Sequence, residues 1–175
     1  MEYRPGKALL TAEEIAKRVQ ELAGVISREY QGRDLLLVCI LKGAAVFWAD
    51  LSRQISIPHE SDFVALSSYG NATESSREIK FEYDLSTNIT GRDVLIIEDI
   101  VDTGHTIKCL KEALEARGPK SLKICALLDK AERREAKVTL DYIGFIIPNE
   151  FVVGYGLDFA QKYRHLPYIA VLVSP

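Results

Sequence analysis

The sequence predicts an α/β protein with a twisted, mainly parallel β-sheet flanked by helices. Nearly continuous apolar runs of strand length occur within residues 34–41, 94–97 and 122–128, as is typical of strands buried on both faces. Segments with apolar residues at helical spacing alternate with these runs, which is the pattern of parallel strands joined by helices. Polar residues follow several strands, so we expect ligand-binding groups at the carboxyl edge of the sheet.

Hydrophobic periodicity and turn signals give the order of the elements. Thr11 and Glu14 have the form of a capping box at the start of a first helix, and Gly118-Pro119 ends a later one. The polar segment 70–77 predicts a long hairpin with a flexible tip. The expected elements are a helix over 11–30, a strand over 34–41, a helix over 44–51, strands over 63–67, 79–83 and 94–97, a helix over 107–116, and strands over 122–128, 142–147, 151–153 and 168–173.

Length and composition predict one domain over residues 1–175. The chain has 175 residues, of which 47% are hydrophobic, and this is enough for a full-sized core. Its formal net charge of -3 and the lack of a long basic run argue against a nucleic-acid partner. The longest wholly apolar run, 35–41, is too short to span a bilayer, and the first residues do not resemble a secretory signal. We therefore expect no membrane partner and a cytoplasmic location.

The segment 94–106 gives the strongest indication of function. Four apolar residues run directly into Glu98 and Asp99, and a small hydroxyl-rich turn then leads into a helix. Backbone N–H groups at a helix start and the helix dipole both favour a phosphate, and Thr103 and Thr106 can add hydroxyl donors. The carboxylates suit sugar hydroxyls or a divalent cation. The segment therefore predicts a site for a ribose 5-phosphate.

The segment from Glu98 to Gly104 closely resembles the phosphoribosyl pyrophosphate (PRPP) signature of type I phosphoribosyltransferases, and neighbouring residues resemble the hypoxanthine-guanine branch. This resemblance implies the fold of that family, with a small hood and a flexible hairpin lid. It implies a purine salvage enzyme that transfers the 5-phosphoribosyl group from PRPP to hypoxanthine or guanine, giving IMP or GMP and pyrophosphate. It also implies Mg²⁺ as cofactor and a homodimer or homotetramer.

Three further motifs resemble the parts of this family that handle pyrophosphate and close the site. The run from Leu41 to Ala44 resembles the pyrophosphate loop, in which relatives can have a cis peptide before the lysine. Ser68-Tyr69 resembles the serine-tyrosine pair of the lid, which would exclude water from the reaction. Arg164 matches an arginine that would contact the pyrophosphate.

Two motifs resemble the purine-binding part of the family. Lys130 matches the lysine that donates to the oxygen at purine C6, and an ammonium group, which has donors only, would reject the amino group of adenine. In the run from Phe151 to Asp158, the resemblance implies that Phe151 stacks on the purine, that the Val152 backbone binds its edge, and that Asp158 ligates magnesium.

The resemblance also implies a general base, Asp102, which would take the proton from purine N7. His105 is expected to contribute its backbone N–H. The predicted substrate-binding residues are Lys42, Gly43, Ser68, Tyr69, Glu98, Asp99, Asp102, Thr103, Gly104, His105, Thr106, Lys130, Phe151, Val152 and Arg164, and the predicted metal ligands are Glu98, Asp99 and Asp158.

Two other functions stay open at this point. The same fold can serve as a PRPP-sensing regulatory protein, which would be expected to show a basic face or an added nucleic-acid-binding domain. A xanthine-preferring transferase is the second alternative, because xanthine also carries an oxygen at C6.

Overall fold

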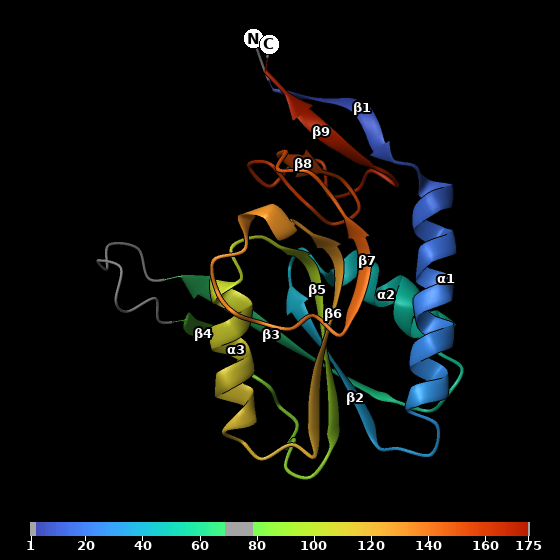
Figure 1. Ribbon diagram of the computed structural model, residues 1–175, viewed down its shortest axis with the longest axis vertical. Helices are drawn as coiled ribbons and strands as arrows, with labels where there is room; N and C mark the ends of the chain where they lie inside the picture. The colour runs from blue at the N-terminus through green and yellow to red at the C-terminus, as the bar shows by residue number, and fades with distance from the viewer. Residues whose placement is uncertain (1–2, 69–78, 175) are drawn as a thin grey trace.

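The computed structural model of the protein describes residues 3–68 and 79–174, which form two sheets with three helices around them (Figure 1). The larger sheet has the order β4-β3-β2-β5-β6-β7, in which only β4 is antiparallel, and a small antiparallel sheet β1-β9-β8 stands above it as a hood. The predicted α/β fold is confirmed. No described helix is long and apolar enough to cross a membrane.

The strands are β1 (Arg4–Leu10), β2 (Leu35–Leu41), β3 (Glu60–Ser68), β4 (Ile79–Tyr83), β5 (Asp93–Val101), β6 (Ser121–Asp129), β7 (Tyr142–Ile146), β8 (Val152–Val153) and β9 (Ile169–Val173). The helices are α1 (Ala12–Glu29), α2 (Ala45–Gln54) and α3 (His105–Glu115), with a short 3-10 turn η1 (Ala131–Arg133).

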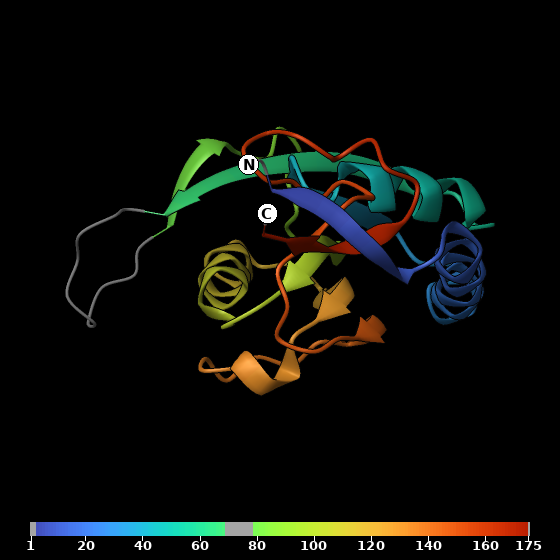
Figure 2. The ribbon, with the colours of Figure 1, turned by 90° about the horizontal axis from the view of Figure 1, so that it is seen from above.

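The central strands fill two hydrophobic clusters, one on each face of the larger sheet. Leu35 and Leu37 of β2 lie in the cluster that includes α1 and α2, whereas Leu36 and Val38 lie in the cluster that includes α3. Figure 2 shows α1 and α3 on opposite sides of the sheet. Because successive strand residues point to opposite faces, only an unbroken apolar run can fill both clusters.

The start of α1 follows the sequence prediction. Thr11 Oγ1 accepts a hydrogen bond from the Glu14 N–H (3.2 Å), and Glu14 accepts one from the Thr11 N–H (2.8 Å), so the capping box is formed. The apolar face of the helix is buried from Ile15 to Ile26.

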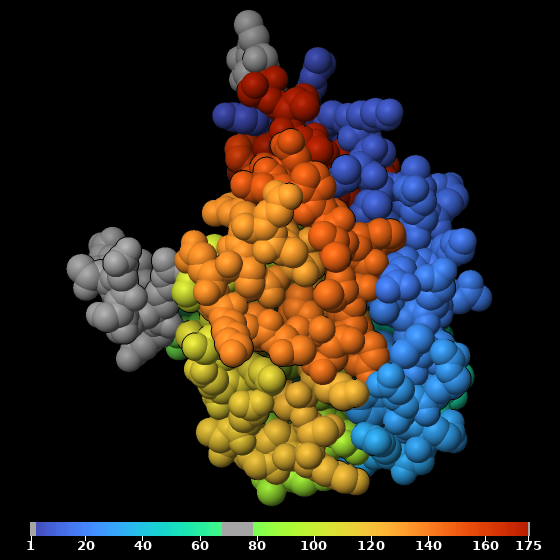
Figure 3. Space-filling model, in the orientation of Figure 1, coloured from blue at the N-terminus to red at the C-terminus, as the bar shows by residue number. Residues whose placement is uncertain are grey.

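The hood contains one strand that the sequence did not predict. β9 pairs antiparallel with both β1 and β8, so the predicted strands at 151–153 and 168–173 build the hood and do not extend the larger sheet. Residues 4–10 include Pro5 and Gly6, which usually mark turns, and proline is tolerated here because β1 is an edge strand. In Figure 3 the hood stands above the orange segment that follows β6.

The order of the parallel strands changes direction between β2 and β5. From β2 the chain moves outward to β3, and from β5 it moves outward the other way to β6 and β7. Pairing of β2 with β5 ends at Cys39 and Ile97, whereas β5 stays paired with β6 as far as Val101 and Asp129. The carboxyl ends of the two central strands therefore part, and ligands bind at such a point in open α/β sheets.

A buried carboxylate on β3 forms hydrogen bonds with the segment between β4 and β5. Asp62 is 3% exposed and accepts hydrogen bonds from the backbone N–H groups of Phe63 (2.8 Å), Ser86 (2.9 Å) and Thr87 (2.8 Å). Burial alone would raise the pKa of Asp62, but these hydrogen bonds together outweigh it and hold the pKa below its ordinary value.

Asp62→Ala is expected to lower the free energy of unfolding by about 1–3 kcal/mol at neutral pH, because three N–H donors lose their acceptor. The depressed pKa makes this contribution complete above the unfolded-state value of about 3.9, and it is lost as the pH falls through the folded-state value. Denaturant unfolding of the variant and the wild type at neutral and acid pH measures both effects. Glu82→Ala, on the exposed side of β4, is the control, and equal losses in the two variants at neutral pH would contradict the assignment.

Candidate active site

Two cavities open where the central strands part. The larger has a volume of about 460 Å³ and the smaller about 200 Å³. The larger is lined by Asp99, Ile100, Asp102, Lys130, Arg133, Asn149, Phe151, Val152, Leu157 and Asp158, and the smaller by Glu98, Ile100, Val101, Asp102, Thr103, Gly104, Thr106 and Ile107. Ile100 and Asp102 line both, so the cavities adjoin at the end of β5.

The smaller cavity lies at the amino end of α3. Gly104 occupies the N-cap position with a φ of 86°, and no side chain caps the helix, so its first backbone N–H groups are open to a ligand. The positive φ favours glycine at position 104, and a Cβ there would also lie 2.8 Å from Arg134 Cδ, so the arginine side chain would have to shift. The Thr103 carbonyl accepts hydrogen bonds from the N–H groups of Glu135 and Ala136 (3.0 and 2.9 Å), which fixes the turn. This geometry suits an anion.

The acidic pair of β5 lies between the cavities. Glu98 lines the smaller cavity and Asp99 the larger, as neighbouring residues of one strand alternate in direction. Burial, and then the adjacent charge of Asp99, raises the pKa of Glu98 well above its ordinary value, and burial also raises the pKa of Asp99. In the described part of the chain no lysine or arginine forms an ion pair with either carboxylate. The pair is therefore suited to a bound cation or to hydroxyl donors.

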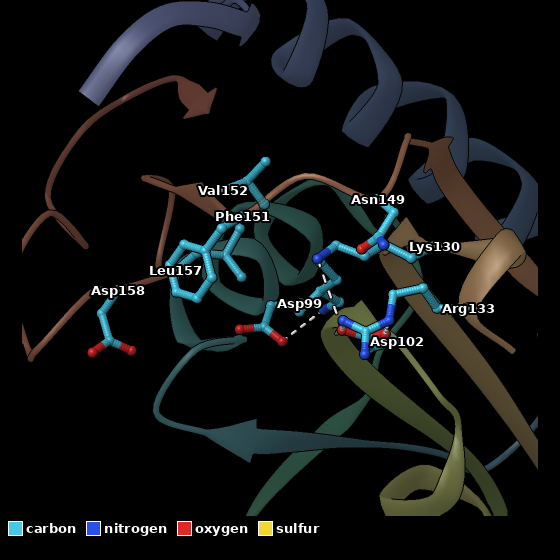
Figure 4. A pocket seen from close by; sticks show the side chains of 10 residues that line it. Asp99, Asp102, Lys130, Arg133, Asn149, Phe151, Val152, Leu157 and Asp158 are labelled. Atoms are coloured by element: carbon cyan, nitrogen blue, oxygen red, sulfur yellow. Dashed lines mark hydrogen bonds and ion pairs between the residues drawn. The ribbon is translucent and has the colours of Figure 1, made fainter. Parts of the chain in front are cut away.

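Asp102 is held by two cations at the junction of the cavities (Figure 4). The Nε atom of Arg133 lies 3.1 Å from Oδ1, its Nη1 donates to Oδ2 at 3.3 Å, and the Nζ atom of Lys130 lies 3.8 Å from Oδ2. Oδ1 is buried, and the described residues donate no hydrogen bond to it, since the Arg133 Nε contact is an ion pair without hydrogen-bond geometry. A buried acceptor without a donor is costly unless a ligand supplies one.

Planar and cationic groups face each other across the larger cavity. The Phe151 ring is 54% exposed and meets the Phe159 ring edge-on, with centroids 5.8 Å apart. Lys130 is only 6% exposed, and its backbone N–H donates to the Val101 carbonyl at 3.0 Å. Figure 4 shows Lys130 beside Asp102, with Asp158 on the far side of the Phe151 ring. A flat ligand can lie on the phenyl ring with one edge toward the ammonium group.

The loop after β2 closes the other side of the crevice. The Leu41–Lys42 peptide is cis. A Cβ on Gly43 would lie 1.8 Å from Asp99 Oδ2, and a Cβ on Gly156 would lie 2.2 Å from the Gly43 carbonyl oxygen. The loop and the segment after β8 are thus in close backbone contact at Gly43 and Gly156. Arg164 donates to the Gly156 carbonyl (2.7 Å) and pairs with Asp158 (2.7 Å), which holds this segment in place.

The phosphoribosyl transferase domain model matches residues 5–160. The chain belongs to the phosphoribosyltransferase family. The hypoxanthine phosphoribosyltransferase of Escherichia coli (strain K12) is 48% identical over 169 residues, which cover 95% of each chain. The hypoxanthine-guanine phosphoribosyltransferase of Bacillus subtilis (strain 168) is 49% identical over 172 residues, which cover 98% of this chain and 96% of the relative.

A solved structure shows the same fold. The crystal structure of a hypoxanthine phosphoribosyltransferase from Staphylococcus aureus matches with a TM-score of 0.93 and 46% identity, over 97% of this chain and 92% of the other. The predicted membership of the phosphoribosyltransferase family, in its hypoxanthine-guanine branch, is thereby confirmed.

Most residues predicted from the phosphoribosyltransferase motifs come together in the structure. The larger cavity contains Asp99, Asp102, Lys130, Phe151, Val152 and Asp158, and the smaller contains Glu98, Asp102, Thr103, Gly104 and Thr106. Lys42, Gly43, His105 and Arg164 line neither cavity. The His105 imidazole instead meets Glu135 at 2.8 Å. Ser68 ends β3, and Tyr69, with the predicted lid tip, lies outside the described residues.

Four residues of the larger cavity were not among the predicted site residues of this phosphoribosyltransferase. They are Ile100, Arg133, Asn149 and Leu157. Ile100 and Leu157 are aliphatic residues that the sequence pattern assigns to the hydrophobic core. Arg133 belongs to a run of charges, and only the 3-10 turn η1 directs it to Asp102.

The predicted metal ligands do not form a closed metal cage. Within residues 3–68 and 79–174, no group of three or more His, Cys, Asp or Glu side chains could hold an ion. Asp158 is engaged by Arg164 and by the Gln161 N–H at 2.8 Å. A metal role for Glu98, Asp99 and Asp158 therefore needs oxygen ligands from a substrate.

Gly43→Ala is expected to disrupt the crevice, because the new methyl group would overlap the Asp99 carboxylate. Overpacking of this kind costs about 1–3 kcal/mol of stability, so a lower melting temperature and weaker nucleotide binding are expected. Thermal unfolding and calorimetric titration with IMP measure the two effects. Gly24→Ala in α1, where the nearest atom to a new Cβ is the Arg28 side chain at 3.6 Å, is the control. A Gly43→Ala protein that matches this control would show that the close approach has no consequence.

Proposed function

We propose that the protein transfers the 5-phosphoribosyl group of PRPP to hypoxanthine or guanine, forming IMP or GMP and releasing pyrophosphate. One observation carries this proposal: an amide-lined cavity and an aromatic cavity with a buried lysine meet at a single carboxylate, Asp102. A nucleoside monophosphate has the same order of parts, a phosphate, a sugar and a flat base. The similarity to enzymes named for this activity supports the assignment.

The smaller cavity is assigned to the 5′-phosphate. The open N–H groups at the start of α3 and the hydroxyls of Thr103 and Thr106 are donors, and the helix dipole adds to their effect. The ribose then lies over Ile100, at the junction of the cavities, with its hydroxyls toward Glu98 and Asp99.

The larger cavity is assigned to the purine. The base stacks on Phe151, and Lys130 donates to its C6 oxygen. Because an ammonium group cannot accept a hydrogen bond, adenine would leave a donor facing a donor in a buried place, which disfavours it strongly.

The reaction joins N9 of the purine to C1′ of the ribose as the bond from C1′ to pyrophosphate breaks. The electron pair of that bond leaves with pyrophosphate, and the proton on N7 passes to the Asp102 carboxylate. The Asp102 side chain is 39% exposed and lines both cavities, so its carboxylate is the proposed proton acceptor. A positioned base of this kind contributes roughly a hundredfold or more to the rate.

The acidic pair fits a magnesium ion. Glu98 and Asp99 offer hard oxygen ligands, have raised pKa values, and form no ion pair with a described cation. Asp158 is the third proposed ligand, released from Arg164 on binding. A bound Mg²⁺ supplies positive charge that stabilises the leaving pyrophosphate.

The remaining family roles are proposals that rest on the sequence motifs. Lys42, Gly43 and Arg164 are assigned to the pyrophosphate, His105 to the phosphate through its backbone N–H, and Ser68 and Tyr69 to a lid. A homodimer or homotetramer and a cytoplasmic location are likewise proposed from the resemblance.

The activity is tested by incubating the protein with PRPP, magnesium and each of six bases: hypoxanthine, guanine, xanthine, adenine, orotate and uracil. Pyrophosphate release is expected with hypoxanthine and guanine and not with adenine, because Lys130 requires an acceptor at C6. Release with xanthine alone would support the xanthine-preferring alternative. PRPP binding without release for any base would favour the sensor.

Asp102→Asn is expected to bind PRPP as the wild type does but to lower kcat about a hundredfold, because the amide cannot take the N7 proton. Steady-state kinetics and calorimetry measure the two quantities. Glu132→Gln, an exposed change nearby in the chain, is the control. An unchanged kcat in Asp102→Asn would remove Asp102 as the base.

A further inference from the structure

Among the described residues that line the larger cavity, Arg133 is the one cation that the proposed reaction does not use. Arg133 is the last residue of the 3-10 turn η1, which begins immediately after Lys130. Its side chain is 44% exposed. Its backbone N–H donates to the Lys130 carbonyl at 2.9 Å, so the turn fixes the two cations relative to each other. Both reach the carboxylate of Asp102.

Stability does not account for this ion pair. Arg133 and Asp102 are both well exposed to solvent, at 44% and 39% of their side-chain surface, and ion pairs of this kind contribute little to folding. The contact does, however, restrict the orientation of the Asp102 carboxylate.

The contacts treat the two carboxylate oxygens differently. Oδ2 accepts a hydrogen bond from Arg133 Nη1 (3.3 Å) and lies 3.8 Å from Lys130 Nζ, whereas Oδ1 has only the charge contact from Nε at 3.1 Å. The guanidinium group therefore contacts both oxygens and fixes the plane of the carboxylate.

We propose that Arg133 is a positioning residue that fixes the plane of the Asp102 carboxylate for proton transfer from the purine N7. This inference rests on the proposed function and adds a residue to it. Arg133 acts on the reaction through Asp102 and makes no required contact with PRPP or the base.

Neighbouring cations cannot replace Arg133 in this role. A lysine is a point charge without a planar fork and cannot hold two oxygens in a set plane. Arg134 pairs with Asp129 and donates to the Asp102 carbonyl oxygen at 3.3 Å, so it supports the backbone and not the carboxylate.

The test compares Arg133→Ala and Arg133→Lys with Lys137→Ala, an exposed residue of the same segment that loses the same charge. Steady-state kinetics with hypoxanthine and PRPP, together with melting temperatures, are measured for each protein. Arg133→Ala is expected to lower kcat by about tenfold to a hundredfold, because a misplaced catalytic group is costly, with both KM values nearly unchanged. Arg133→Lys should recover little of this loss, and Lys137→Ala should retain wild-type kcat.

A double-mutant cycle with Asp102→Asn decides whether Arg133 acts through Asp102. Adding Arg133→Ala to Asp102→Asn should lower kcat by less than about twofold, because residues that act as a unit are not additive. Fully additive losses, a raised KM for PRPP as the main effect, or full recovery by lysine would each overturn the inference. A wild-type protein that is inactive with every base would instead refute the proposed function, so the two failures are distinct.

Discussion

The site depends on the parting of β2 from β5 after the pair Cys39 and Ile97. Beyond this pair β5 has a strand neighbour on one side only, so carboxylates can follow a buried apolar run without entering the core. The opposite wall is the loop after β2, and it comes so close that Gly43 lacks room for a single methyl group beside Asp99. The crevice is thus a consequence of strand order, and its width is set by backbone contact.

The three carboxylates at the end of β5 have different surroundings, which favour different chemical roles. Glu98 and Asp99 lie together without a cationic side chain in ion-pair contact among the described residues, and burial raises their pKa values. Asp102 is held by Lys130 and Arg133. Because their environments differ, carboxylates of one short segment can serve in different roles: Glu98 and Asp99 as the proposed cation ligands, and Asp102 as the proposed general base.

The larger sheet and most of the site could be predicted from sequence because their signals are local. The apolar run that begins at Val94 and leads into Glu98 predicts both a buried strand and its polar carboxyl end. The capping box predicts where α1 starts. β1 could not be predicted, since only pairing with β9 makes a strand of a segment with Pro5 and Gly6. Arg133 and Asn149 were missed because their direction is set by the turns after β6 and β7, which carry no periodic signal.

The register of β5 against β6 places the proposed general base beside the lysine that is proposed to recognise the purine. Val101 pairs with Asp129, so the residues that follow, Asp102 and Lys130, leave the sheet side by side. The Lys130 N–H to Val101 carbonyl bond continues the ladder by one step and holds this relation. A purine with its C6 oxygen at Lys130 therefore has N7, on the same edge of the ring, near Asp102. Because a slip of β5 by one residue would turn Asp102 to the other face of the sheet while Lys130 stayed in place, the hydrophobic pattern that sets the register also sets the spacing of the proposed donor and the proposed general base.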